Sequence, residues 1–225
     1  MFATDLDDTL FSEMDYVRSG YRAIGHELER HGVMPQQEAV EILESAEDSA
    51  RGFDNLAARI WMKHPGSPFT DTWMVGVYRT HKPDIKLLPG VEEMLERIKG
   101  RGIEIGIITD GRSNTQRAKI DAMGLTDFVK PENIIISSEI GADKTTETPF
   151  TTLAARNPQE KRFLYLGDNP AKDFRWPNAL GWTTVEILNP DFIHVHPQEI
   201  DVPEEYRSAY IINAISELSE LFDKM

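Results

Sequence analysis

Short apolar runs of strand length alternate with helical patterns along much of the 225-residue chain, and this alternation limits the possible folds more than any other feature. The runs are almost continuously apolar, which is typical of strands buried on both faces of a parallel sheet. The expected strands are residues 1–4, 103–108, 133–136, 163–166, 182–187 and 209–212. The sequence therefore predicts an α/β fold, a Rossmann-like core with three layers and a parallel sheet.

Residues 15–84 interrupt the alternation, because four helical patterns follow one another there without a strand pattern. Gly32 is expected to end the first of these helices, and Thr70 is expected to cap the fourth. We therefore expect a core domain of residues 1–14 and 85–225, and an inserted all-helical domain of residues 15–84. An insert after the first strand is placed to act as a lid over the carboxyl edge of the sheet. Its large aromatic residues are expected in its own core: Trp61, Trp73 and Tyr78.

Composition limits the possible partners. The chain has no cysteine, which excludes disulfides and thiolate metal sites. Its formal net charge of −14 argues against binding to nucleic acid or to an anionic membrane. No apolar run approaches the roughly 20 residues that a membrane-spanning helix needs. We therefore expect a soluble cytoplasmic protein that meets an anionic ligand only through a metal ion or a few placed lysines and arginines.

Three acidic residues follow the first expected strand directly: Asp5, Asp7 and Asp8. They would lie at the carboxyl end of a parallel strand, where open α/β sheets bind ligands. Carboxylates this close repel one another, and a divalent cation such as Mg²⁺ is the most natural way to hold them together. An acidic turn that caps a helix would explain this segment equally well by itself.

Further polar residues follow the later strands in the same way. Thr109 comes after the second expected strand, Lys144 after the third, and Asp168 and Asp173 after the fourth. Each is ordinary alone, as a turn hydroxyl, a surface lysine or a Gly-Asp turn. Because the ends of parallel strands converge, however, together they predict one cleft with a carboxylate nucleophile, a hydroxyl, an ammonium group and an acidic pair.

These segments carry a resemblance to a known family. DLDDT, ITDG, the downstream lysine and GDNPAKD resemble the four motifs of the haloacid dehalogenase-like (HAD) hydrolases, and the resemblance covers nearly the whole chain. The helical insert looks like the C1-type cap of that family, and LLPGV at 87–91 is similar to its return linker. One departure is Thr145, which follows Lys144 where the family often has proline.

The resemblance implies roles for the first motif. Asp5 would attack a phosphoryl group and become an aspartyl-phosphate. Asp7 would donate a proton to the leaving alcohol and later take one from the attacking water. Mg²⁺ would be held by the Asp5 carboxylate, the Asp7 backbone carbonyl and Asp168. Asp173 is a further candidate at the metal, although fixing Lys144 or a metal-bound water is the role that we favour for it.

The resemblance also implies which residues bind the phosphoryl group. Thr109 and Lys144 would bind the oxygens whose negative charge rises in the transition state, with Asp110 and Gly111 of the same motif beside them. Two residues are placed to line the cleft, Arg112 and Asn169. Substrate choice would lie with the cap, where Arg18 and Arg22 share a helix face. Those two arginines could instead pair with acidic neighbours.

The residue at position 7 helps to define the reaction. Hydrolysis of a phosphate ester needs a proton donor for the leaving group, whereas a dehalogenase does not, so Asp7 favours a phosphatase. We therefore expect a Mg²⁺-dependent phosphohydrolase of a small phosphorylated metabolite, with a slight preference for sugar phosphates, in a monomer or weak homodimer. The alternatives are a phosphomutase or phosphotransferase and a non-catalytic phosphate-binding protein.

His194 and His196 alternate as a pair of metal ligands can, but no third ligand follows them in the sequence. We therefore expect no metal role for these two histidines.

Overall fold

The structure is a computed structural model that describes residues 1–190, 194–198 and 200–218. The chain divides into two compact units, which we call the core unit (residues 1–14 and 86–225) and the helical unit (residues 15–85). The sequence had suggested the second boundary one residue earlier, between residues 84 and 85. Within the described part of the chain, no helix is both long and apolar enough to cross a membrane.

The core unit is built on one parallel sheet with the strand order β3-β2-β1-β4-β5-β6. The strands are β1 (Phe2–Thr4), β2 (Ile105–Thr109), β3 (Ile134–Ile136), β4 (Leu164–Gly167), β5 (Thr183–Ile187) and β6 (Tyr210–Ile212). Each lies within two residues of its expected bounds. The predicted α/β class with a Rossmann-like parallel sheet is confirmed.

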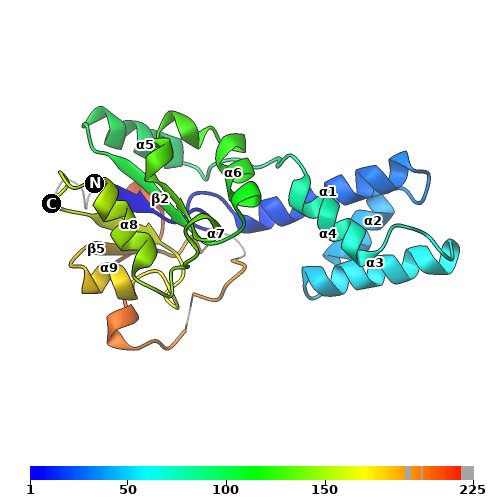
Figure 1. The fold of residues 1–225 in the computed structure, drawn as a ribbon. Coiled ribbons are helices and arrows are strands. Elements are labelled where there is room, and N and C mark those ends of the chain that lie inside the picture. Colours follow the sequence, from blue (N-terminus) through cyan, green and yellow to red (C-terminus); the bar gives the residue numbers. More distant parts are fainter. Residues whose placement is uncertain (191–193, 199, 219–225) are drawn as a thin grey trace. The chain divides into compact units, whose positions relative to one another are not determined.

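Helices cover both faces of the sheet, with α5 and α6 on one side and α8 and α9 on the other (Figure 1). The helices of the core unit are α5 (Val91–Gly100), α6 (Ser113–Ala122), α7 (Ser137–Ile140), α8 (Thr148–Arg156) and α9 (Arg175–Ala179). Short 3-10 turns are η1 (Leu125–Asp127), η2 (Pro131–Asn133), η3 (Glu204–Tyr206) and η4 (Ile215–Glu217). The helix expected at the C-terminus extends into residues 219–225, which lie outside the described residues.

The apolar strands explain how the layers hold together. Every residue of β1, β2, β3 and β4 is buried, as expected for strands covered on both faces. On one face, Phe150 and Leu153 of α8 belong to the same buried cluster as Ala3 and Tyr165 of the sheet. Strand β6, at one edge of the sheet, differs from the others because it exposes its first two residues.

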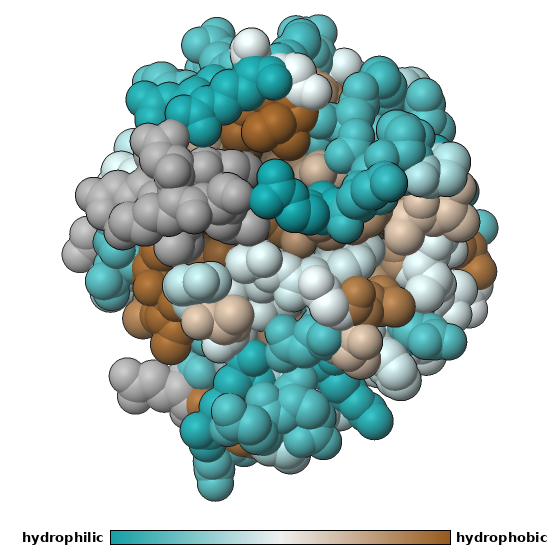
Figure 2. Space-filling view, turned by 90° about the vertical axis from the view of Figure 1, so that its left-hand side faces the viewer, coloured by the Kyte–Doolittle hydropathy of each residue, from teal (hydrophilic) through white to brown (hydrophobic). Residues whose placement is uncertain are grey.

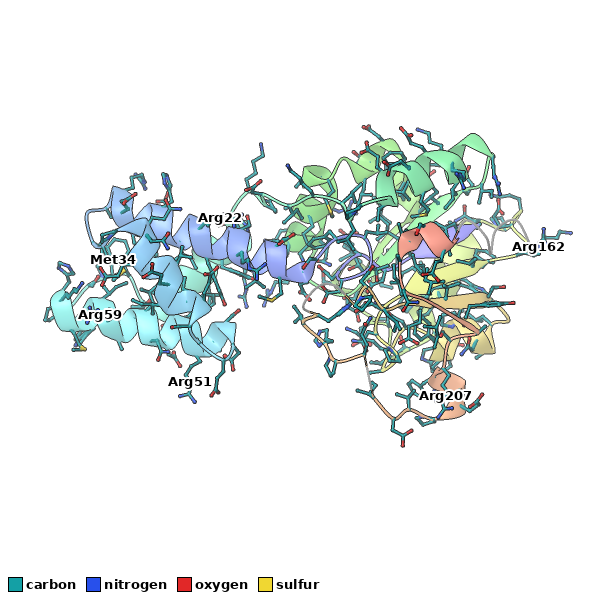
Figure 3. The ribbon with its side chains drawn as sticks, turned by 180° about the vertical axis from the view of Figure 1, so that it is seen from behind. Arg22, Met34, Arg51, Arg59, Arg162 and Arg207 are labelled. Atoms are coloured by element: carbon teal, nitrogen blue, oxygen red, sulfur yellow. The ribbon has the colours of Figure 1, made fainter. Side chains whose placement is uncertain are left out.

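Among the described residues, the exposed large hydrophobic side chains are Trp61, Met62, Leu180, Val195, Tyr210 and Ile211. The face drawn in Figure 2 is mainly hydrophilic, with hydrophobic residues in separate groups among the polar ones. Arg162, which precedes β4, extends away from the sheet into solvent (Figure 3). This surface agrees with the acidic, highly charged composition.

The helical unit comprises α1 (Glu13–Arg30), α2 (Gln36–Glu44), α3 (Ser49–Lys63) and α4 (Asp71–Thr80), with the first residues of α1 belonging to the core unit. Its core contains one buried stripe from each helix, including Ile24, Leu43 and Leu56. Gly32 has a positive φ of 69° just after α1, and the Thr70 side chain accepts a hydrogen bond from the backbone nitrogen of Trp73 at 3.3 Å. Both helix-end predictions are confirmed.

One aromatic residue of this unit is not where the sequence suggested. Trp73 and Tyr78 pack against the buried cluster, but Trp61 is 57% exposed. On α3 the inward stripe runs through Leu56 and Ile60. Residue 61 follows Ile60 by about 100° of helical turn, which carries its side chain off that stripe.

Candidate active site

The site begins where β1 ends. Strand β1 lies between β2 and β4, so its carboxyl end is the point at which the chain turns to opposite sides of the sheet. Such switch points are where open α/β sheets bind ligands. The backbone nitrogen of Asp5 still donates to the carbonyl of Leu166 at 2.8 Å, which fixes Asp5 at the sheet edge.

A small cavity of about 80 Å³ opens at this edge and is lined only by core-unit residues. A space of this size suits a phosphoryl group. The predicted site residues that line it are Asp5, Asp7, Thr109, Asp110, Lys144, Asp168 and Asn169. Strand ends that lie far apart in the sequence thus meet at one cavity, as the sequence predicts.

Lys144 is the centre of the charge arrangement. Its ammonium nitrogen lies 2.9 Å from Asp5 Oδ1 and 2.6 Å from Asp173 Oδ1, and its side chain is 1% exposed. Burial alone would lower the pKa of Lys144, but the carboxylates of Asp173 and Asp5 outweigh it and hold that pKa well above its usual value. The Lys144 ammonium group and the Asp5 carboxylate are therefore direct neighbours of opposite charge.

Asp173 is fully buried and held by several donors. Besides Lys144, it accepts a hydrogen bond from the backbone nitrogen of Asn169 at 2.9 Å and one from the Tyr165 hydroxyl at 3.4 Å. Glycine at 167 makes room for it, since a Cβ there would lie 2.6 Å from Asp173 Oδ2. These contacts agree with the predicted role of Asp173 in fixing Lys144.

The carboxylates fit a divalent cation. Oxygens of Asp5, Asp168 and Asp173 lie within 4.8 Å of one another, and all three residues are buried. With Lys144, these three carboxylates leave a formal charge of −2. Burial raises the pKa of Asp5 well above its usual value and raises that of Asp168, and the neighbouring carboxylates add to both shifts. Buried carboxylate oxygens with uncompensated charge are suited to Mg²⁺.

Asp7 is held by helix α6. Gln116 Nε2 donates to Asp7 Oδ2 at 2.7 Å, and Lys119 Nζ donates to Asp7 Oδ1 at 2.5 Å. Gln116 Nε2 also donates to Thr109 Oγ1 at 2.6 Å. Because the Thr109 hydroxyl is the acceptor in that bond, it keeps its own hydrogen for another partner.

The turn after β2 supports Lys144 from its backbone. Asp110 Oδ1 accepts a hydrogen bond from the Lys144 backbone nitrogen at 3.1 Å, and Asp110 Oδ2 lies 3.3 Å from Lys172 Nζ. Gly111 has a φ of 147° and donates its backbone N–H to Ser137 Oγ at 2.9 Å. Gly111 does not line the cavity, whereas Lys172 does.

Asp8 connects the site to the segment after β5. It has a positive φ of 52°, and its carboxylate accepts from the backbone nitrogens of Glu13 at 2.7 Å and Val195 at 2.8 Å. His194 Nδ1 lies 3.9 Å from Asp8 Oδ2 and 3.8 Å from Asp168 Oδ2. Asp8, Asp168 and His194 thus form a second cluster of possible metal ligands, which the spacing of the histidines alone did not suggest.

Glu13 is a further titratable group at the cavity. Burial raises its pKa to about 7, and the neighbouring carboxylate of Asp7 adds to the shift. Its backbone nitrogen bonds Asp8, so the start of α1 is tied to the first motif.

The remaining candidate substrate residues are Arg18, Arg22 and Arg112. Arg18 lies 3.7 Å from Asp15 and Arg22 lies 3.2 Å from Asp84, both within the helical unit, where Figure 3 marks Arg22 on α1. Pairing with acidic neighbours was the alternative to substrate binding that the sequence offered for Arg18 and Arg22. Arg112 is exposed at the start of α6 and does not line the cavity. A role for these three in substrate binding stays a prediction.

Several residues at the site had no signal in the sequence strong enough to assign them to it: His194, which lies beside Asp8, and His196, Glu13, Gln116, Lys119 and Lys172. One weak signal existed. The segment 113–122 has few apolar residues, yet it must cover a face of the sheet, so some polar side chain had to be buried there. Gln116 and Lys119 are those residues, at 1% and 3% exposed.

The family model described as haloacid dehalogenase-like hydrolase matches residues 3–187. The chain belongs to this family of hydrolases, which confirms both the family recognised in the sequence and the expectation of a hydrolase.

Curated relatives carry phosphatase names. Glyceraldehyde 3-phosphate phosphatase of Methanocaldococcus jannaschii is 26% identical over 96% of this chain and 94% of its own. Ribulose-1,5-bisphosphate 5-phosphatase of Halopiger xanaduensis is 29% identical over 70% of this chain and 67% of its own. The pyrimidine 5'-nucleotidase YjjG of Escherichia coli is 30% identical over 61% of this chain and 57% of its own.

Solved structures share the fold. The HAD-hydrolase YfnB of Bacillus subtilis, solved with magnesium bound, has a TM-score of 0.66 and 20% identity, covering 99% of this chain and 97% of its own. A HAD phosphatase of Thermococcus onnurineus has a TM-score of 0.60 and 19% identity, covering 98% and 96%.

Proposed function

We propose that this hydrolase is a Mg²⁺-dependent phosphatase of a small phosphorylated metabolite, and that sugar phosphates are its substrate class. The observation that carries the proposal is the buried contact between Asp5 and Lys144, which puts the proposed nucleophile beside an ammonium group at a cavity of about 80 Å³. The names of the relatives, glyceraldehyde 3-phosphate phosphatase above all, support the substrate class.

In the proposed reaction, a carboxylate oxygen of Asp5 attacks phosphorus, and the bond from phosphorus to the alcohol oxygen breaks. Asp7 gives its proton to that oxygen, so the alcohol leaves neutral and Asp7 becomes a carboxylate. Lys144 and the Thr109 hydroxyl bind the phosphoryl oxygens as their negative charge rises. Water then attacks phosphorus while Asp7 takes a proton from it, the bond from phosphorus to the Asp5 oxygen breaks, inorganic phosphate leaves, and the Asp5 carboxylate is restored.

Mg²⁺ would be held by the Asp5 and Asp168 carboxylates and the Asp7 backbone carbonyl. When bound, it offsets the repulsion between the Asp5 carboxylate and the phosphate. Asp173 would act beside it by fixing Lys144, to which it is bonded at 2.6 Å. The four-helix insert is proposed to be the C1-type cap, with Arg18 and Arg22 as candidates for contact with the non-reacting part of the substrate.

The test is release of inorganic phosphate from p-nitrophenyl phosphate and a panel of metabolites, with Mg²⁺ and with EDTA. The panel contains glyceraldehyde 3-phosphate, ribulose 1,5-bisphosphate, pyrimidine 5'-monophosphates and phosphoglycolate. We expect Mg²⁺-dependent release, fastest for a sugar phosphate.

Asp5→Asn is the matched control, because it nearly keeps the shape but removes the nucleophile. We expect it to lower kcat by about 1,000-fold or more. Retention of most activity by this variant would contradict the mechanism. Phosphate transfer between substrates without net release would instead support a phosphomutase.

A further inference from the structure

Helix α6 places two buried polar side chains on Asp7. Gln116 and Lys119 lie three positions apart, so they share one face of the helix. They are 1% and 3% exposed, and each donates to a different oxygen of the Asp7 carboxylate. Asp7 thus has a separate donor for each oxygen, which restricts its carboxylate to one orientation.

Burying the Lys119 ammonium group costs free energy unless its charge has a partner. Lysine is almost never fully buried without a partner, because its ammonium group loses its water. The ammonium nitrogen of Lys119 lies over the Phe11 ring, 5.6 Å from the ring centroid. Lys119 is therefore closed to solvent on its own side of the pair, whereas the Asp7 side chain is 19% exposed where it lines the cavity.

The same helix face connects Asp7 to the predicted phosphoryl-binding group. Gln116 Nε2 donates to both Asp7 Oδ2 and Thr109 Oγ1. One side-chain amide therefore bridges the end of β2 and the carboxylate after β1. A shift of α6 would move both groups together.

We propose that Gln116 and Lys119 are positioning residues that hold the Asp7 carboxyl group for its two proton transfers. The inference rests on the proposed phosphatase function. In the first half-reaction the Asp7 proton passes to the leaving alcohol oxygen, and in the second the Asp7 carboxylate takes a proton from the attacking water. Neither Gln116 nor Lys119 exchanges a proton with the substrate. They fix the direction from which Asp7 approaches it.

A purely structural role is the competing explanation, in which the same contacts only tie α6 to the first motif. The two roles differ in their dependence on the leaving group. An alkoxide needs a proton as it leaves, whereas p-nitrophenolate leaves without one. A residue that acts through Asp7 must therefore matter more for an alkyl phosphate than for an aryl phosphate.

The experiment compares kcat/KM for p-nitrophenyl phosphate and for the best alkyl phosphate of the panel, both with Mg²⁺. The variants are Lys119→Met, which keeps the length of the side chain, and Gln116→Leu, which keeps the ion pair of Lys119 with Asp7. Lys130→Met is the control, because Lys130 pairs with Glu104 on the exposed surface of the same unit. Gln116→Leu also serves if Lys119→Met proves too unstable to fold.

We expect Lys119→Met to lower kcat/KM about 10- to 100-fold for the alkyl phosphate and only a few-fold for the aryl phosphate. Gln116→Leu should show the same preference with a smaller loss, and Lys130→Met should match the wild type on both substrates. In an Asp7→Asn background, Lys119→Met should cost less than about two-fold, because both changes remove the same function.

If the wild type is active, two results would overturn this inference and leave the proposed function standing. One is an equal loss of kcat/KM on both substrates in Lys119→Met. The other is a loss from Lys119→Met that is as large in the Asp7→Asn background as in the wild type. If instead the wild type releases no phosphate from any compound of the panel, the proposed function fails and this inference fails with it.

Discussion

At the level of single residues, the site is distinguished by charged side chains that are buried. Asp5 and Asp173 are buried carboxylates that share one buried ammonium group, that of Lys144. Removing one member of such a group leaves the others without compensation, and this costs more than the intact arrangement contributes. Lys144 is therefore expected to serve both the proposed reaction and the stability of the fold.

We expect Lys144→Met to lower the free energy of unfolding by about 3–5 kcal/mol, because two carboxylates are left buried and unpaired. Urea denaturation in EDTA measures this. Lys144→Met combined with Asp173→Asn should recover part of the loss, since only one of the two carboxylates then stays charged. A Lys144→Met variant as stable as the wild type would contradict the charge arrangement described for the site.

Gly167 offers a steric test of the same site. We expect Gly167→Ala to destabilise the protein by about 1–3 kcal/mol, because the new Cβ would overlap Asp173 Oδ2 at 2.6 Å. It should also lower kcat, since Asp173 holds Lys144. Thermal unfolding and phosphate release measure the two effects.

Gly76→Ala is the matched control. Gly76 lies in α4, and a Cβ there meets no other atom within 4 Å. This substitution should stabilise the protein by up to about 1 kcal/mol through helix propensity. Equal effects of the two alanines would show that Gly167 carries no steric constraint.

At the scale of elements, the segment after β5 supports the metal-binding end of the site. His194 Nε2 lies 2.6 Å from the carbonyl oxygen of Leu188, to which it donates, and its other ring nitrogen faces Asp8 and Asp168. Gln198 Nε2 donates to the Asp168 carbonyl at 3.1 Å. Two side chains of one segment thus orient the predicted metal ligand Asp168.

We expect His194→Ala to raise the Mg²⁺ concentration at half-maximal activity about 10-fold or more, because residues that orient metal ligands typically affect affinity on that scale. Activity at saturating Mg²⁺ should fall much less. His26→Ala, on the exposed side of α1, is the control. An unchanged Mg²⁺ requirement in His194→Ala would show that this segment does not orient Asp168.

At the scale of the whole molecule, metal binding and folding should be coupled. The carboxylates of Asp5, Asp168 and Asp173 are held close together only in the folded chain, and with Lys144 they keep a formal charge of −2. A ligand that binds only the folded state stabilises it, by about 2.7 kcal/mol at a concentration of 100 times its Kd.

We therefore expect Mg²⁺ to raise the midpoint of thermal unfolding of the wild type, and Asp168→Asn to abolish most of that rise. In EDTA, the unfolding midpoint of Asp168→Asn should be at least as high as that of the wild type, because the substitution removes one of the repelling buried carboxylates. Calorimetry of both proteins, with Mg²⁺ and with EDTA, measures the four midpoints. A wild-type midpoint indifferent to Mg²⁺ would contradict a metal site at these residues.

Local patterns in the sequence are enough to predict the class of fold and the order of the principal site residues. Apolar periodicity is a local property, and so is the position of Asp5, Thr109, Lys144 and Asp168 behind successive strands. Parallel pairing then brings strand ends to one edge, so their meeting could be inferred without coordinates.

The side chains that support those residues could not be found from local patterns. Gln116 and Lys119 are 109 and 112 residues from Asp7 in the sequence, and no local pattern connects them. The same holds for His194 beside Asp168. The exposure of Trp61 also depended on which side of α3 faces its neighbours. The physical reason is that burial and pairing are set by packing between distant segments, whereas periodicity records only which face of each segment is apolar.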